Sequence, residues 1–381
     1  MSEFKASGFS DEFGSSGPNI VGLTTFTSPY YFVPPSGSTA QRPSSPPPGM
    51  LRFNTDIGRL EVWRNDHWAT ILGESPNLGD QNNTNSSGGT GTRGLFAGGT
   101  APSPTPYVDT IDYISLSTLG NAQDFGNLTT TQAAAAGLAS RTLGIFGGGY
   151  TPGGAMINSI DFVTIASTGN AADFGDLTVK TARSFACSNS TRGLIGGGQG
   201  PGADLQNNID YITIASTGSV QDFGDMTAAI GYINACSSSV RGVMGGGEGG
   251  GGNVNIIQFV TISTTGNAQD FGDLTVARTY AASCSSSTRG VFGGGHPATN
   301  VIDFITISST GNAQDFGDRT SASYGSSACS SPTRGVFGGD SGNSGTIDFV
   351  TIAATGNASD FGDLSVGRNL PGACSNGHGG L

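Results

Sequence analysis

The sequence of 381 residues is poor in charged side chains, and lysine is almost absent from it. Charged residues make up 12% of the chain, with 16 Lys and Arg against 28 Asp and Glu. Lys5 and Lys180 are the only lysines. A nucleic-acid partner requires clustered cations that contact the phosphate backbone. The net charge of −12 therefore argues against nucleic-acid binding.

Long apolar runs are also lacking. No stretch approaches the roughly 18 consecutive apolar residues that a membrane-spanning helix needs. The first residues, Met-Ser-Glu-Phe-Lys, do not contain the apolar core of a signal peptide. We therefore expect no insertion into a membrane.

Histidine and cysteine do not form a catalytic or metal-binding pattern. The three histidines, His67, His296 and His378, lie in unrelated parts of the sequence. The five cysteines occupy equivalent places in a repeat: Cys187, Cys236, Cys284, Cys329 and Cys374. A disulfide needs Cα atoms within about 7 Å, whereas stacked sheets lie about 10 Å apart. We expect buried apolar cysteines, no metal, no cofactor and no catalytic residue, so the protein is not predicted to be an enzyme.

Glycine, with 64 residues, is abundant, and it belongs to a repeat that fills the chain from about residue 92 onward. The tripeptide Asp-Phe-Gly recurs every 45 to 49 residues and marks the register. It begins at Asp124, Asp173, Asp222, Asp270, Asp315 and Asp360. A period of this size is typical of a solenoid or a propeller.

One period contains four short strand patterns and no helical pattern. In the copy that precedes Asp315, a small alternating strand at 281–285 is followed by an apolar strand at 290–292 that ends in glycines. An aromatic strand at 301–307, apolar on both faces, and a strand beginning at Asp315 complete the copy. Four-stranded antiparallel sheets repeated radially are the blades of a β-propeller. Two further residues recur with the repeat, and the Asp of the aromatic strand is expected to pair with the repeated Arg or with the backbone. The repeated Asp residues are Asp112, Asp161, Asp210, Asp303 and Asp348, and the repeated Arg residues are Arg192, Arg241, Arg289 and Arg334.

This order of strands resembles a kelch repeat. A kelch unit has a diglycine after its second strand and an aromatic pair further on, and here Gly293–Gly295, Phe304 and Phe316 occupy those places. The resemblance covers about 290 residues in six copies. The sequence departs from the kelch pattern because Phe stands where kelch has Trp on the outer strand. The resemblance implies an all-β fold, a six-bladed kelch-like β-propeller.

The two ends of the array predict how the propeller closes. The first copy begins at the apolar strand 93–97, with no small strand before it, and the last copy ends with a small strand at 371–375. Six strands of each type exist only if the two ends share one blade. We therefore expect the C-terminal strand to complete blade one within a propeller of residues 92–381, which leaves no open sheet edge.

The first 91 residues do not match the repeat. Residues 1–72 are expected to form an extended arm rich in proline, followed by a β-hairpin at 50–72, where apolar residues alternate around a glycine-containing turn. Residues 73–91 have the composition of a flexible linker. The candidate attachment residues of the arm are its aromatic side chains: Tyr30, Tyr31, Phe32, Trp63 and Trp68.

Two segments resemble structural proteins of bacteriophages. The stretch from Leu51 to Asp56, through Leu60–Trp63 to Trp68, resembles a segment of phage fibre and appendage subunits. The copy Thr265–Leu274 is similar to repeats in structural proteins of phages of marine cyanobacteria. The resemblance implies a virion protein, such as a tail fibre, an appendage or a capsid decoration, which is a homo-oligomer in the virion. The arm would contact other virion proteins.

Two alternatives remain for the propeller. It would be an adhesin that binds a glycan or protein of the host surface, or an enzyme that acts on polysaccharide. The loops after the glycines vary in sequence and should share one face, which makes them the candidate binding surface. The candidate residues there are Tyr107, Tyr150 and His296. The paired aspartates that flank each Phe-Gly would satisfy turn amides or bind calcium.

Overall fold

The computed structural model describes residues 34–70, except 45 and 65, and residues 92–381, except 104, 105 and 219. The described residues are almost entirely β-strand and turn, with two single-turn 3-10 helices, η1 (Thr39–Gln41) and η2 (Pro201–Ala203). The chain divides into two compact units, Met1–Leu78 and Gly79–Leu381. The linker predicted at 73–91 lies outside the described residues.

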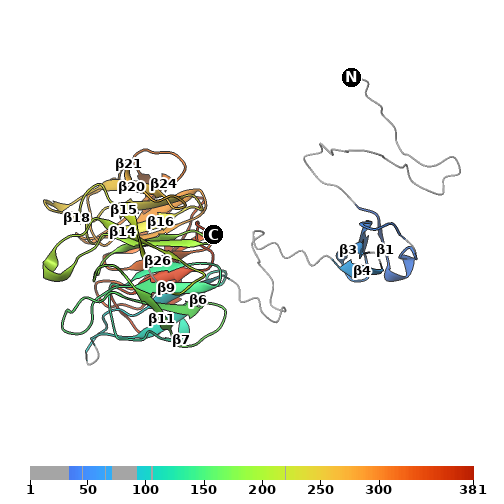
Figure 1. Ribbon diagram of the computed structural model, residues 1–381, viewed down its shortest axis with the longest axis horizontal. Coiled ribbons are helices and arrows are strands. Elements are labelled where there is room, and N and C mark those ends of the chain that lie inside the picture. The colour runs from blue at the N-terminus through green and yellow to red at the C-terminus, as the bar shows by residue number, and fades with distance from the viewer. Residues whose placement is uncertain (1–33, 45, 65, 71–91, 104–105, 219) are drawn as a thin grey trace, which may run out of the picture. The chain divides into compact units, whose positions relative to one another are not determined.

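The N-terminal unit contains a small four-stranded sheet (Figure 1). Its strands are β1 (Ser36–Gly37), β2 (Leu51–Asn54), β3 (Arg59–Arg64) and β4 (His67–Thr70), in that order. The pairing of β2 with β3 confirms the predicted hairpin, and the structure adds β4 on one side and a parallel β1 on the other.

A buried polar network stabilises this small sheet. The Glu61 side chain is fully buried and accepts hydrogen bonds from Arg42, from Arg52 at 3.4 Å and from Asn54 Nδ2 at 3.0 Å. A buried carboxylate is tolerated only when it is paired in this way. The sequence alone did not predict this cluster because its members lie on separate strands and in the proline-rich segment.

Residues 92–381 form a propeller-like ring of four-stranded antiparallel sheets, called the ring below (Figure 1). The described residues contain six such sheets, which we number 1 to 6 along the chain. The first, innermost strands are β30 (Gly372–Ser375) of sheet 1, then β8 (Ala136–Ala139), β12 (Phe185–Ser188), β16 (Asn234–Ser237), β22 (Ala282–Ser285) and β26 (Ser327–Ser330). The second strands are β5 (Arg93–Ala97), β9 (Leu143–Gly147), β13 (Arg192–Gly196), β17 (Arg241–Gly245), β23 (Arg289–Gly293) and β27 (Arg334–Gly338).

The two outer strands of each sheet follow in the same order. The third strands are β6 (Thr110–Ser115), β10 (Ser159–Thr164), β14 (Asn208–Thr213), β20 (Ile256–Thr261), β24 (Thr299–Thr306) and β28 (Thr346–Thr351). The fourth strands are β7 (Gln123–Asn127), β11 (Ala172–Asp176), β15 (Gln221–Asp225), β21 (Gln269–Asp273), β25 (Gln314–Ser323) and β29 (Ser359–Asp363). A two-stranded hairpin of β18 (Glu248–Gly249) and β19 (Gly252–Asn253) projects from sheet 4.

The ring closes where β30 pairs with β5, in the way that the distribution of strand types predicts. Cys374 lies opposite Leu95, and Ala373 lies opposite Phe96. Each innermost strand contacts the innermost strands of both neighbouring sheets, including β30 with β8 and β26 with β30. Small residues are needed on these strands because six backbones converge around one axis.

The cysteines pack between neighbouring sheets. Cys187 lies in sheet 3 beside Gly242 of sheet 4, and a Cβ on that glycine would be only 2.6 Å from Cys187 Sγ. Cys236 has the same relation to Gly290 of the next sheet. The five cysteines are free and buried, and burial raises the pKa of the Cys187 thiol to about 12. The invariant pairing of a sulfur with a glycine supports a packing role for them.

The Asp-Phe-Gly tripeptide is a contact between sheets. Phe125 is buried, and its main-chain oxygen accepts a hydrogen bond of 2.8 Å from the Gly169 amide of the next sheet. Gly126 has φ +149°, and a Cβ there would collide with the main chain of Gly169. The same contact recurs between Phe361 and Gly120, where the ring closes.

The repeated Asp of the third strand also joins two sheets, but its partner is not the repeated Arg. Asp161 accepts hydrogen bonds from the Thr129 amide at 2.9 Å and from Thr129 Oγ1 at 2.7 Å. The repeated Arg instead stacks on an aromatic ring, as Arg192 does on Tyr211 at 4.3 Å, and donates to a main-chain oxygen of the next sheet. Of the two partners expected for this Asp, the backbone contact is observed and the pairing with the repeated Arg is not.

Candidate functional site

The innermost strands of the six sheets surround a central channel. One end of this channel carries six equivalent residues in a left-handed backbone conformation. They precede the innermost strands, ten residues after the Asp of each Asp-Phe-Gly, and they are Ala134, Arg183, Tyr232, Tyr280, Gly325 and Leu370. The five that are not glycine have φ between 54° and 60°. Such values are rare for residues with a Cβ and cost on the order of 1–3 kcal/mol each.

Main-chain hydrogen bonds link these residues around the channel. The Arg183 amide donates to Ala134 O at 3.1 Å, and the Tyr232 amide donates to Arg183 O at 3.0 Å. Equivalent bonds connect Tyr280 to Tyr232, Ala134 to Leu370, and Leu370 to Gly325. Because these hydrogen bonds are made by the main chain, the side chains at the six positions are free to differ without loss of the fold.

Aromatic side chains and one arginine gather at this end, which we call the tyrosine mouth, formed by Tyr150, Arg183, Tyr232, Tyr280 and Tyr324. The Arg183 guanidinium lies 4.7 Å from the Tyr150 ring centroid and 5.0 Å from that of Tyr232. Tyr232 and Tyr280 are 4.7 Å apart, and Tyr280 and Tyr324 are 6.0 Å apart. The set therefore forms a continuous arc.

The three loop residues proposed from the sequence lie along this arc. Tyr107 contacts Tyr150 edge to face at 5.9 Å, so the structure brings these two together. His296 is exposed and lies at the other end, 5.0 Å from Tyr324. The main residues between them, Arg183 and the tyrosines 232, 280 and 324, were not proposed from the sequence. The sequence did contain a signal for the first three of these residues, because the position ten residues after the Asp of each Asp-Phe-Gly varies in an otherwise regular repeat.

Hydrogen bonds fix the arginine of the mouth. Arg183 Nη1 donates to Gln199 Oε1 at 2.6 Å, and the Tyr232 hydroxyl donates to the same oxygen at 3.3 Å. No carboxylate of the described residues lies within ion-pair distance of Arg183, and its Nε is buried without a hydrogen-bond partner there. Burial raises the pKa of Tyr150 and of Tyr280, so both hydroxyls stay protonated and able to donate.

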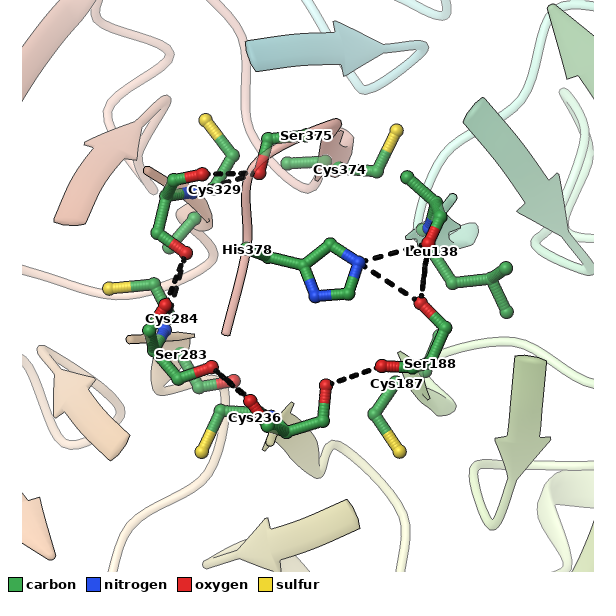
Figure 2. Close-up of a pocket in the computed structure, with 18 of the residues that line it drawn as sticks. Leu138, Cys187, Ser188, Cys236, Ser283, Cys284, Cys329, Cys374, Ser375 and His378 are labelled. Carbon is green, nitrogen blue, oxygen red and sulfur yellow. Dashed lines mark hydrogen bonds between the residues drawn. The ribbon is translucent and has the colours of Figure 1, made fainter. Parts of the chain in front are cut away.

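The opposite end of the channel is lined by serine hydroxyls. Each donates to the main-chain oxygen of the equivalent residue in the preceding sheet, as Ser237 Oγ does to Ser188 O at 2.8 Å. The members are Ser188, Ser237, Ser285, Ser330 and Ser375. Figure 2 shows the cysteine sulfurs pointing away from the channel into the spaces between sheets.

The segment after β30 places His378 inside this serine ring (Figure 2). Sheet 2 has Ala139 where the other sheets have serine, and His378 Nε2 lies 2.9 Å from Ala139 O and 3.2 Å from Ser188 Oγ. The Gly380 amide donates to His378 Nδ1 at 3.1 Å. Nδ1 is therefore the acceptor, which places the proton on Nε2 of a neutral ring.

Burial lowers the pKa of His378 to about 4, and the hydrogen bond to Ala139 O opposes this shift. A histidine whose folded pKa lies below its unfolded value of about 6.5 binds fewer protons when folded. We therefore expect the contribution of His378 to the free energy of unfolding to be constant above about pH 6.5. This contribution should fall as the pH decreases toward 4, by at most about 3 kcal/mol. Solvent reaches part of the ring, so the observed loss should be smaller.

Thermal melting between pH 4 and 8, compared with His378→Gln, measures this effect. The variant should lack the fall between pH 6.5 and 4. Asp161 and Asp210 have pKa values raised by burial and act in the opposite direction in both proteins, so the difference between the two curves isolates His378. Parallel curves would contradict the prediction.

The candidate attachment residues that the structure describes lie on neighbouring strands of the N-terminal unit. Trp63 of β3 faces Trp68 of β4, with ring centroids 5.6 Å apart, and both are half-buried. Arg52 lies over Trp68 at 5.7 Å. Tyr30, Tyr31 and Phe32 lie outside the described residues.

The paired aspartates lie on the fourth strands, and most of them are exposed, as Asp173 and Asp176 are on β11. The second aspartate of a pair forms a hydrogen bond to the next sheet through its main-chain amide. For example, the Asp225 amide donates to Asn267 Oδ1 at 3.0 Å. Within 34–70 and 92–381, apart from the gaps given above, no group of three or more acidic, His or Cys side chains is arranged to hold a metal ion.

Within the same part of the chain, no helix is long and apolar enough to cross a membrane. No protein-family model matches the sequence, and a comparison with curated proteins gives no significant match.

Proposed function

We propose that this protein is a structural virion protein, a tail fibre, appendage or capsid decoration, in which residues 92–381 are a six-bladed kelch-like β-propeller displayed at the particle surface. The observation that supports this division of roles is that the chain has two separate compact units of different construction. The ring closes on itself through β30 and β5. The N-terminal unit is a small sheet with an aromatic pair on one face.

The N-terminal unit is the better candidate for attachment. Its sheet ends in the two-residue strand β1 and in β4, so its edges are available to another chain. Trp63 and Trp68 offer a half-buried aromatic surface of the kind that is enriched in protein interfaces. Attachment to other virion proteins through this unit leaves the mouth of the propeller for a ligand on the host surface.

The experiment compares the full chain and its variants in their binding to virus particles that lack the protein. The full chain should bind, and full-length Trp63→Ala/Trp68→Ala should bind at least about tenfold more weakly, as expected when an aromatic hot spot is lost. Tyr280→Gly, which alters an aromatic residue of the other unit, is the matched control and should bind like the unaltered chain. Circular dichroism and light scattering of each variant report the fold and the expected homo-oligomer.

Equal particle binding by the Trp variant and the unaltered chain would contradict attachment through this face. Particle binding by residues 92–381 alone, as strong as that of the full chain, would contradict the division of roles.

A further inference from the structure

Three side chains of the tyrosine mouth, those of Arg183, Tyr232 and Tyr280, are not required by the architecture that carries them. The six equivalent ring positions accept Ala, Arg, Tyr, Tyr, Gly and Leu with nearly the same backbone conformation. Gly325 shows that glycine fits there without a left-handed penalty. Tyr232 and Tyr280 instead keep a bulky side chain in a strained conformation, which is the kind of outlier that points to function.

The positive charge of the mouth comes from Arg183, which differs from the buried arginines of the ring. Three other arginines of the ring are buried and each pairs with an aspartate: Arg278 with Asp303, Arg319 with Asp348, and Arg368 with Asp112. Arg183 has no such partner among the described residues, although the chain carries a net charge of −12. The Arg183 guanidinium lies against the rings of Tyr150 and Tyr232, and the Nη hydrogens that Gln199 does not use are available to donate to a carboxylate.

The shape of the mouth limits how a ligand would enter it. Arg183, Tyr232, Tyr280 and Gly325 line a cavity of about 40 Å³. This volume suits one or two water molecules or a group of similar size, but not a sugar ring. A ligand would therefore place a small anionic group in the cavity and lay its larger part across the half-buried tyrosines.

We propose that the tyrosine mouth binds an acidic saccharide, with the sugar carboxylate at Arg183 and the pyranose C–H faces against Tyr232 and Tyr280. The aromatic faces carry negative π-density, which attracts polarised C–H groups, and their hydroxyls donate to sugar oxygens. Gln199 holds Arg183 and Tyr232 in position through one shared oxygen. The proposal deepens the display role given above, but binding at the mouth does not require attachment to a particle.

The test uses the full-length protein and isothermal titration with tetrasaccharides of glucuronate, galacturonate and mannuronate, and with sialyllactose. Maltotetraose is the neutral probe. At least one acidic probe should bind in roughly the micromolar to millimolar range, and maltotetraose at least about tenfold more weakly. Inorganic sulfate is titrated separately to measure binding of a simple anion.

Two variants separate the roles of charge and stacking. Arg183→Gln should weaken the binding of the acidic probe by about tenfold or more and remove the preference for it over maltotetraose. Tyr280→Gly, which introduces the residue found at the equivalent position Gly325, should weaken the binding of both the acidic probe and maltotetraose. Arg192→Gln is the matched control, because Arg192 also stacks on a tyrosine but lies outside the mouth and donates to Ile262 O; its affinity should be unchanged.

Absence of binding by all four acidic probes overturns the proposal, and so does equal binding by Arg183→Gln. Sulfate binding as strong as the best saccharide, with no effect of Tyr280→Gly, would show a simple anion site and would also overturn it. None of these outcomes depends on the particle experiment, so failure of the ligand assignment is distinguishable from failure of the virion assignment.

Discussion

Deletion of Arg368–Leu381 is expected to abolish the cooperative folding of the ring. The deletion removes β30, so the edge of β5 loses its partner and Leu95 and Phe96 lose the strand opposite them. It also removes Arg368, whose Nη2 donates to Asp112 Oδ2 at 2.6 Å and to Phe96 O at 3.3 Å. Asp112, which is fully buried, would lose its cation. Breaking the buried pair alone costs about 3–5 kcal/mol, which is a large part of the about 5–15 kcal/mol that typically keeps a domain folded, and the loss of β30 adds to this cost.

Thermal melting and light scattering measure this effect. The truncated protein should melt without a cooperative transition, or far below the full chain, and should associate through the exposed strand edge. Deletion of Asn376–Leu381 alone is the control, because it keeps β30 and Arg368 and removes only the segment that carries His378. This shorter deletion should remain monodisperse. An unchanged melting temperature after the larger deletion would contradict the role of β30 in closure.

The repeat predicts the strands and the closure of the ring because these depend on properties that recur in every copy. Apolar alternation places the second and third strands, such as β23 and β24, and the unequal ends of the array place β30 beside β5. Gly126 and its equivalents could be recognised as turn residues. Their actual role, the close approach to the next sheet at Gly169, requires knowledge of which turn lies beside which strand.

The candidate site was only half predictable because it depends on departures from the repeat. Reasoning from the variable loops proposed Tyr107, Tyr150 and His296, which lie at the end of the channel where the tyrosine mouth is found. It missed Arg183 and Tyr280, because these residues precede small strands and their sequence context is that of a structural segment. Only the ring geometry shows that residues about 48 positions apart stand side by side around one axis.

The buried aspartates of the third strands give the sharpest test of how the sheets are joined. Arg278 and Asp303 are both fully buried, and Arg278 Nη2 lies 2.9 Å from Asp303 Oδ2. Asp303 also accepts hydrogen bonds from the Thr275 amide at 3.1 Å and from Thr275 Oγ1 at 2.6 Å. The arginine has no second carboxylate among the described residues, and burial lowers its pKa. Asp303 is therefore the one carboxylate among the described residues that compensates the charge of Arg278.

The neighbouring sheets show which parts of this arrangement can be lost. Asp161 and Asp210 have no arginine and are held by Thr129 and Thr178, and burial raises the pKa of both carboxyls. Between sheets 3 and 4, the equivalent pair is Ile230 and Gln258, where Gln258 Oε1 accepts a hydrogen bond of 2.9 Å from the Thr227 amide. The fold therefore accepts an aspartate without arginine, or neither charge, but none of the six described sheets of the ring has the arginine without its aspartate.

We therefore expect an asymmetric double-mutant cycle. Asp303→Gln leaves a buried, uncompensated guanidinium and should lower the free energy of unfolding by about 3–5 kcal/mol. Arg278→Ile leaves Asp303 with its threonine and should cost about 1–3 kcal/mol, mainly through lost packing. The double variant copies Ile230 and Gln258 and should be more stable than Asp303→Gln. Urea unfolding of all four proteins at neutral pH measures the cycle. A double variant whose loss equals the sum of the two single losses would mean that the two buried charges do not depend on each other, and would exclude this account of how sheets 4 and 5 are joined.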